Sequence, residues 1–287
     1  MTRITTQNSS SFVETLAQMI VSPSGDKHPA DRHPLPSWTE TVTLLEDLRA
    51  LLLMTLEPGD VEQRLSRAMR QLNSQLSACV MASGSQRQKP IPSDEFLVQL
   101  PQIRQALQED TETALQSDPA VTSRDEVRLC YPGLRALAYY RVARALYSLD
   151  VPLLPRLISE IGHSVTGIDI HPGAQIGRRF FIDHGTGVVI GATCIIGDDV
   201  KIYQGVTLGA RSFPRSEEGH IIKGIERHPI IGDRVTIYSG ATILGRIHIG
   251  PDSVIGGNVW ITRDVPAKSH VMQQRPRQDR FIYGDGI

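Results

Sequence analysis

The sequence predicts an α+β protein in which an N-terminal all-α helical domain precedes a C-terminal parallel β-helix with one looped-out insertion. Two observations lead to this prediction: aliphatic residues recur every six positions after about Ile168, and helix-capping signals occur before it. A six-residue period fits neither an α-helix, which repeats at about 3.6, nor an amphipathic strand, which repeats at about 2. Hexapeptide repeats are typical of β-helices, where each repeat supplies one short strand and one corner.

The repeat runs in two series with one interruption between them. The first series slips by two residues after its third member and consists of Ile170, Ile176, Ile182, Ile190, Ile196, Ile202 and Leu208. The second consists of Ile231, Ile237, Ile243, Ile249, Ile255 and Ile261. Small or β-branched residues follow many of them four positions later: Cys194, Val200, Val206, Val235, Ala241 and Val259. We expect the aliphatic side chains to fill the coil interior and the polar run 211–220 to leave it as a loop.

The residues before the repeat predict helices. Ser37 with Glu40, and Ser123 with Glu126, have the Ser-x-x-Glu spacing of a capping box. Further helical stretches are expected at about 60–81, 96–107, 134–147 and 153–161. We therefore expect a loosely ordered, proline-rich leader at 1–36, a helical domain at 37–167, the β-helix at 168–265 and a C-terminal tail at 266–287.

Composition limits the classes of partner. The formal net charge of the 287-residue chain is -1, so no global basic field attracts nucleic acid or anionic lipid. Cys79, Cys130 and Cys194 are far apart in sequence, which favours free thiols over disulfides or a zinc knuckle. No apolar run is long enough for a signal peptide or a membrane span. We expect a cytoplasmic protein with no nucleic-acid or membrane partner.

Histidines gather in the repeat region on both sides of the interruption: His171, His184, His220 and His228. Asp169, Asp183 and Arg227 lie close to three of them in sequence. Any one of these histidines is explained equally well as a solvated residue at a coil corner or as part of a site. As a group they indicate a site, because imidazole, with a reference pKa of about 6.5, can take a proton from a weak hydroxyl nucleophile.

Several motifs resemble the core of the serine O-acetyltransferase family in matching order. They are Asp-Ile-His-Pro-Gly-Ala-Gln-Ile-Gly at 169–177, Asp-His-Gly-Thr-Gly at 183–187, Gln-Gly-Val-Thr-Leu-Gly at 204–209, Arg-His-Pro at 227–229 and an upstream Asp-Pro-Ala at 118–120. The resemblance covers roughly 90–265 and returns at the last residues. It implies a left-handed parallel β-helix and direct transfer of acetyl from acetyl-CoA to L-serine, the first step of cysteine biosynthesis.

The resemblance also implies roles for single residues. His184 is expected to be the general base, Asp169 to accept the other ring N–H of His184, and His228 to be the second catalytic imidazole. Arg227 is expected to hold the serine carboxylate, and Asp118 and Asp183 its ammonium group. These residue types suit a zwitterionic acceptor, because arginine pairs with planar carboxylates through parallel N–H donors. A thioester is already activated, so no metal is expected.

Acetyl-CoA is expected in a groove between coils of adjacent subunits of a homotrimer, or of a hexamer of two trimers. The candidates for this groove, which are equally well explained as small corner residues, are Gly209, Ala210, Ser239, Gly240 and Gly257. The chain departs from the family pattern at 209–213, Gly-Ala-Arg-Ser-Phe in place of Gly-Gly-Thr-Gly-Lys, and after Val265, where the usual Gly-Val-Pro-Ala is missing.

The last five residues, Tyr-Gly-Asp-Gly-Ile, are similar to the family's terminal peptide. The resemblance implies that Ile287 docks into the active site of O-acetylserine sulfhydrylase, where an aliphatic residue with a free carboxylate mimics an amino acid. A frayed polar terminus is the alternative. Feedback inhibition by cysteine, which resembles serine, is a further implication of the family resemblance.

Four alternative functions remain open at this point. A γ-class carbonic anhydrase shares the repeat and uses three histidines on zinc, which the histidines of this chain could supply. An acetyltransferase for a sugar, or for another hydroxy or amino acid, shares the fold, although a sugar leaves the charged residues without a partner. A non-catalytic scaffold for the sulfhydrylase explains the tail but not the histidines. Cys194 as an acyl-carrying nucleophile is disfavoured by its interior position in the repeat.

Overall fold

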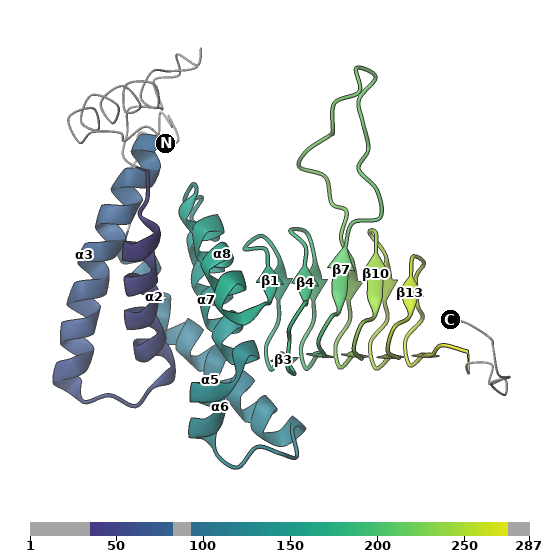
Figure 1. Cartoon of the computed structure of the whole chain (residues 1–287), viewed down its shortest axis with the longest axis horizontal. Helices are drawn as coiled ribbons and strands as arrows, with labels where there is room; N and C mark the ends of the chain where they lie inside the picture. Colours follow the sequence, from purple (N-terminus) through teal and green to yellow (C-terminus); the bar gives the residue numbers. More distant parts are fainter. Residues whose placement is uncertain (1–34, 83–92, 275–287) are drawn as a thin grey trace, which may run out of the picture.

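The structure, a computed structural model, describes residues 35–82 and 93–274, which form a helical half followed by a solenoid (Figure 1). The described helices are α2 (Trp38–Leu53), α3 (Pro58–Ala82), α4 (Ser93–Leu97), α5 (Leu100–Ser117), α6 (Arg124–Cys130), α7 (Pro132–Ser148) and α8 (Leu154–Thr166). Both predicted caps are confirmed, because Ser37 Oγ accepts the N–H of Glu40 at 3.3 Å and Ser123 Oγ accepts that of Glu126 at 3.2 Å. None of these helices is long and apolar enough to cross a bilayer. Most of the expected leader lies outside the described residues.

The solenoid is a left-handed β-helix made of short parallel strands. These are β1 (Asp169–Ile170), β2 (Gln175–Ile176), β3 (Phe181–Ile182), β4 (Val189–Ile190), β5 (Ile195–Ile196), β6 (Lys201–Ile202), β7 (Thr207–Gly209), β8 (Ile230–Ile231), β9 (Thr236–Ile237), β10 (Thr242–Leu244), β11 (His248–Ile249), β12 (Val254–Ile255), β13 (Trp260–Ile261) and β14 (His270–Val271). They form three sheets: sheet A in the order β1-β4-β7-β10-β13, sheet B in the order β11-β8-β5-β2, and sheet C in the order β14-β12-β9-β6-β3. Every third strand therefore returns to the same face of a triangular prism. The predicted fold class is confirmed.

The repeated aliphatic residues fill the prism, as the period predicts. Of the thirteen positions in the two series, all are buried except Ile176, which is partly buried against the core. Before many of the strands the preceding residue is small and buried as well, Cys194, Val200, Val206, Val235 and Ala241 being fully covered. The coils stack in register, with these side chains inside.

Two irregularities interrupt the coils. The two-residue slip after Ile182 lengthens the corner between β3 and β4, which contains His184. The predicted insertion is the loop 210–229 between β7 and β8, which projects from the prism (Figure 1). Its tip folds back on itself, because the N–H of Ser216 donates to the His220 carbonyl at 2.8 Å.

The solenoid continues past residue 265, where the sequence pattern suggested its end. β14 pairs with β12, and the N–H groups of Val254 and Gly256 donate to the carbonyls of Ser269 and Val271 at 2.8 and 2.7 Å. This last strand satisfies backbone donors that would otherwise end the sheet unpaired. It was missed because the segment lacks the on-phase isoleucine of the earlier coils. Residues 275–287 of the tail lie outside the described part.

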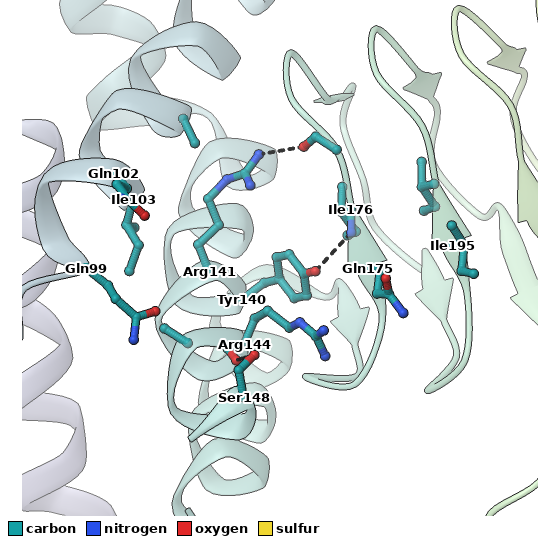
Figure 2. Close-up of a pocket in the computed structure, with 14 residues that line it drawn as sticks. Gln99, Gln102, Ile103, Tyr140, Arg141, Arg144, Ser148, Gln175, Ile176 and Ile195 are labelled. Carbon is teal, nitrogen blue, oxygen red and sulfur yellow. Dashed lines mark hydrogen bonds between the residues drawn. The ribbon is translucent and has the colours of Figure 1, made fainter. Parts of the chain in front are cut away.

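Helices α5 and α7 are anchored to the first coil by polar contacts, and Figure 2 shows those made by Arg141 and Tyr140 of α7. Arg141 donates to the Asp110 carboxylate at 2.7 Å and to the Gly177 carbonyl at 3.1 Å. The other oxygen of Asp110 accepts the N–H of Phe180 at 3.0 Å. Tyr140 donates to the Ala174 carbonyl at 2.7 Å. Burial raises the pKa of Asp110 to about 6, against the lowering effect of Arg141, so the pair is ionised at pH 8.

We expect Asp110→Ala to lower the free energy of unfolding by about 3–5 kcal/mol, because it leaves the buried Arg141 without its counter-charge. Urea unfolding at pH 8 and fixed protein concentration measures the change. Glu112→Ala is the matched control, since it removes an exposed carboxylate paired with Arg124, and its effect should be much smaller. Equal effects of the two variants would contradict a structural role for the buried pair.

Candidate active site at two edges of the prism

Most of the predicted site residues of the solenoid lie at the two prism edges that flank sheet A. The first, which we call the His184 edge, joins sheet C to sheet A and comprises residues 183–188, 203–206, 238–241 and 256–259. The second, the loop edge, joins sheet A to sheet B and comprises residues 171–174, 191–194, 210–229 and 245–247. Asp183, His184, Ser239, Gly240 and Gly257 lie on the His184 edge. Gly209 and Ala210 lead into the loop edge, which contains Arg227 and His228.

His184 projects from the lengthened corner between β3 and β4. Its backbone φ is 55°, in the left-handed region that non-glycine residues seldom occupy, and its side chain is 72% exposed. Its Nδ1 lies 3.7 Å from a carboxylate oxygen of Asp183, which is itself mostly covered. The imidazole therefore stands free at the prism edge, beside an acidic group and open to a substrate or a second chain.

Asp118 approaches this edge from the helical half, at the C-terminal end of α5. One carboxylate oxygen accepts the N–H of Ala120 at 2.8 Å, and the other accepts the hydroxyl of Tyr131 at 2.5 Å. The Tyr131 hydrogen bond is the main cause that lowers the pKa of Asp118, and His184 lowers it further by charge attraction. The structure thus brings Asp118 and His184 into one electrostatic environment, although 66 positions separate them in sequence.

Asp169 belongs to the same region but does not touch His184. It opens β1, and the nearby backbone is tied to the His184 corner by the N–H of Gly187, which donates to the Gly167 carbonyl at 2.9 Å. Among the described residues the Asp169 side chain makes no hydrogen bond. The carboxylate that contacts His184 in this chain is that of Asp183. The expected pairing of Asp169 with His184 therefore stays a prediction.

His228 is held in one orientation by Thr193 on the neighbouring coil. The Thr193 N–H donates to His228 Nδ1 at 3.1 Å, and Thr193 Oγ1 lies 2.8 Å from the same nitrogen. That hydroxyl already accepts the N–H groups of Arg227 and His228 at 3.0 and 3.2 Å, so its own hydrogen points to Nδ1. This network assigns the ring proton of neutral His228 to Nε2.

The ring of His228 packs directly on Gly191. A Cβ atom at residue 191 would lie 2.1 Å from His228 Cδ2, so only glycine fits there. His228 is 6% exposed, and its burial, with Arg227 and Arg246 nearby, lowers its pKa to about 4. The imidazole is thus neutral near pH 7 and offers an Nε2–H donor.

Three arginines gather at the loop edge. Arg227 stacks over the Phe213 ring at 5.9 Å, and its Nε is buried without a hydrogen-bond partner among the described residues. Arg246 pairs with Glu226 at 2.8 Å and donates to the His228 carbonyl at 3.1 Å, which fixes the returning end of the loop. Arg211, Arg227 and Arg246 line a hollow of about 260 Å³. An unsatisfied guanidinium N–H in such a hollow suits a carboxylate or phosphate ligand.

The residues expected to bind acetyl-CoA divide between the same two edges. Ser239, Gly240 and Gly257 stack on successive coils of the His184 edge, where the Asn258 N–H donates to the Ser239 carbonyl at 2.9 Å. A Cβ at Gly240 would lie 2.1 Å from Asn258 Oδ1. Gly240 therefore has a packing reason to lack a side chain. Gly209 and Ala210 lie across sheet A, at the start of the loop.

The geometry of one chain bears on two of the alternative functions. His171 and His228 lie on the loop edge and His184 on the other, and within the described ranges of a single chain no three or more His, Cys, Asp or Glu side chains are grouped so that they could hold a metal ion. Cys194 is fully buried, its Sγ–H donates to the Leu208 carbonyl at 3.4 Å, and burial raises its pKa to about 12. A buried thiol of this kind is inert as a nucleophile.

A further hollow of about 500 Å³ lies elsewhere, between α5, α7 and sheet B (Figure 2). Arg141, Arg144 and Gln175 line it, and none of the expected site residues does. Arg141 there is committed to Asp110 and Gly177. This hollow is therefore a feature of the junction between the two halves.

Sequence reasoning missed three residues that shape the site: Tyr131, Thr193 and Arg246. Tyr131 and Thr193 belong to no motif, since each acts through a partner 13 or 35 positions away. Arg246 lies in a corner that the repeat alone would assign to solvent. To find them, one must know which residues touch in the folded chain, and neither the repeat nor the motifs give that information.

Comparison with known proteins identifies relatives of this chain. Residues 228–263 match the family model described as bacterial transferase hexapeptide (six repeats). A plasmid-encoded serine acetyltransferase of Synechococcus elongatus is 44% identical over 301 aligned positions, covering 96% of this chain and 94% of the relative. The serine acetyltransferase of Bacillus subtilis is 49% identical over 166 positions, covering 58% of this chain and 72% of the relative.

Solved structures extend the similarity to the whole architecture. Serine acetyltransferase isoform 3 of Entamoeba histolytica, crystallised in complex with cysteine, superposes with a TM-score of 0.73 at 33% identity and covers 95% of this chain and 94% of its own. Serine acetyltransferase 1 of the same organism, in complex with L-cysteine, gives 0.72 at 35% identity, with 91% and 96% covered. With the sequence relationship along nearly the full length, these findings show that the chain belongs to the serine acetyltransferase family.

Proposed function

We propose that the two edges of sheet A act together as the serine acetyltransferase site, each site being built from two neighbouring subunits. As a member of its family, the chain transfers acetyl from acetyl-CoA to the hydroxyl of L-serine. The observation that carries the proposal is the division of the expected site between edges on opposite sides of one sheet. In a cyclic trimer, the His184 edge of one subunit can face the loop edge of the next.

The charged groups fit the ends of a serine zwitterion. Arg227, whose buried Nε has no hydrogen-bond partner among residues 35–82 and 93–274, offers parallel donors to the carboxylate. Asp118 and Asp183, at the His184 edge, offer acceptors to the ammonium group. A sugar acceptor would leave these three charges unpaired, which disfavours the alternative of sugar acetylation.

His184 is proposed as the general base. It takes the serine hydroxyl proton as that oxygen attacks the thioester carbonyl carbon, and the carbon–sulfur bond then breaks. The imidazolium returns the proton to the departing CoA sulfur, so no covalent enzyme intermediate is needed. Asp169 is expected to pair with the other ring nitrogen when substrate tightens the site, as catalytic hydrogen bonds often do.

His228 is proposed as the hydrogen-bond donor to the developing oxyanion. Its Nδ1 lone pair is occupied by the two Thr193 donors, and its Nε2 already carries the proton. A neutral imidazole in this state cannot accept the serine proton at Nε2. The same arrangement preorganises one N–H for negative charge, which stabilises acyl-transfer transition states.

The remaining assignments rest on the family relationship. We propose a homotrimer, or two trimers paired through the helical half, with acetyl-CoA in the groove formed by the Ser239–Gly240 corner, Gly257 and the Gly209–Ala210 segment. Cysteine is proposed to bind the serine site as a feedback inhibitor, and Ile287 to dock into O-acetylserine sulfhydrylase. A cytoplasmic location agrees with the three free cysteines, of which Cys130 is exposed.

Acetyl-CoA consumption by the purified protein should be fast with L-serine and slow with sugars, amines and other hydroxy amino acids. His184→Ala should lower kcat by about 10²–10⁴-fold, the usual contribution of a general base. Thiol release measures both effects. A preference for another acceptor would contradict the proposed acceptor, and an active His184→Ala enzyme would contradict the base.

A mixing experiment tests the shared site. His184→Ala and His228→Ala should each be nearly inactive, whereas mixed trimers of the two should regain about a third of the wild-type activity, because about one in three interfaces of a mixed cyclic trimer carries both intact histidines. Tagged mixed trimers, purified through both tags, supply the sample. Failure to recover activity in verified mixed trimers would show that both histidines act within one chain.

If His228 is a hydrogen-bond donor and His184 a base, glutamine should restore activity in place of His228 but not in place of His184. His228→Ala should lower kcat by about 10²–10³-fold, and His228→Gln, which keeps an N–H donor near Nε2, should recover part of the loss. His184→Gln should recover nothing over His184→Ala, since an amide is no base. Recovery at neither position would contradict the donor assignment.

The burial of the His228 ring predicts that the folded protein is less stable in acid. Since the folded-state pKa of His228 is about 4, below the ordinary value, the unfolded chain binds a proton that the folded chain does not between about pH 6.5 and 4. The free energy of unfolding should therefore be highest above this window and fall as the pH decreases through it. Urea unfolding of wild type and His228→Gln at pH 7 and 5 measures the difference, and an equal loss in both would contradict the contribution of His228.

A further inference from the structure

Tyr131 lies between two groups of the proposed serine site, which are Asp118 of the helical half and the corner that contains Asp183 and His184. It is the residue between α6 and α7, and its hydroxyl donates to the Asp118 carboxylate at 2.5 Å. The second oxygen of Asp118 accepts the Ala120 N–H at 2.8 Å. Asp118 follows the last turn of α5, where side-chain direction is not fixed by the helix. These two donors therefore decide where its carboxylate points.

The backbone after Tyr131 is packed against the strand that leads to the catalytic corner. Pro132 fixes the start of α7, and Gly133 lies so close to β3 that a Cβ there would be 2.2 Å from the Ile182 carbonyl oxygen. Ile182 immediately precedes Asp183 and His184 in the chain. The backbone that carries Tyr131 is thus seated directly on the strand that leads to the His184 corner.

The pKa shifts keep Tyr131 and Asp118 in the protonation states that their hydrogen bond requires. Burial, then the hydrogen bond to Asp118, raises the pKa of Tyr131, so the phenol stays protonated and remains a donor. The hydrogen bond lowers the pKa of Asp118, so the carboxylate stays ionised. A charged carboxylate held by two neutral donors keeps lone pairs free for a third one, such as an ammonium group.

We infer that Tyr131 is a positioning residue for acceptor recognition, holding Asp118 against the His184 corner so that its carboxylate meets the ammonium group of serine. This inference rests on the proposed role of Asp118. It assigns to the α6–α7 junction a share of the specificity for amino-acid acceptors over simple hydroxy acids. Tyr131 does so through Asp118 and without a contact of its own to the reacting atoms.

The test compares L-serine with 3-hydroxypropionate, which has the same hydroxyl and carboxylate but lacks the ammonium group. Tyr131→Phe removes one oxygen atom and should raise the KM for serine roughly tenfold, as the loss of a hydrogen bond to a charged group does. The KM for acetyl-CoA should not change. The kcat/KM for 3-hydroxypropionate, or its constant as a competitive inhibitor of serine, should also stay the same.

Tyr203→Phe is the matched control. Burial is the main cause that raises the pKa of Tyr203, followed by the charges of Tyr238, Asp183 and Asp118, so this tyrosine lies near both carboxylates. Within the described residues its hydroxyl nevertheless makes no hydrogen bond to either of them. This variant should leave the ratio of the two acceptors unchanged. Tyr131→His, which keeps a ring with an N–H donor, should recover part of the serine preference if Tyr131→Phe proves unstable.

Asp118→Asn separates the failure of this inference from that of the proposed function. If Asp118→Asn keeps the full preference for serine over 3-hydroxypropionate, the ammonium role of Asp118 is wrong, whatever Tyr131 does. If Asp118→Asn loses the preference and Tyr131→Phe keeps it, only the positioning role is overturned. Equal losses for both acceptors in Tyr131→Phe would show a merely structural residue and would also overturn the inference.

Discussion

The stacking of aliphatic side chains inside the prism is the constraint on which the rest of this structure depends. Each coil must place its inward residues on those of the coil before it, so the strands pair in register, as Ile190 does with Leu208 and Leu208 with Ile243. Because the strands are only two or three residues long, every corner lies next to a paired strand, and its backbone is held as firmly as that of the faces. A side chain at a corner therefore has a defined position although it belongs to no long element.

This rigidity explains how functional groups from distant parts of the sequence share a surface. The His184 corner carries two extra residues, and the loop edge carries a long insertion, yet the coils around them keep their register. His228 returns from the loop onto Gly191, where Thr193 satisfies both its backbone N–H and its ring. A neutral imidazole with a fixed proton is the result of that fit, and it distinguishes His228 from the open, exposed His184.

The helical half completes the site and does more than cap the prism. The buried pair of Asp110 and Arg141 fastens α5 and α7 to the first coil, and the close approach of Gly133 to Ile182 sets their distance. Asp118, at the end of α5, reaches the His184 edge because of these contacts. The position of Asp118, an acidic group of the proposed serine site, is thus decided by packing between the two halves.

The sequence by itself determined the solenoid, since a six-residue period allows no other regular structure, and it marked the slip after Ile182 and the interruption between Leu208 and Ile231. The family motifs pointed to His184, His228, Asp118 and Arg227. Only the tertiary structure decided that these residues divide between two edges, that Thr193 fixes the tautomer of His228, that β14 extends the solenoid, and that Tyr131 holds Asp118. Periodicity reports interactions that repeat along the chain, whereas these contacts join single residues across long separations and leave no periodic trace.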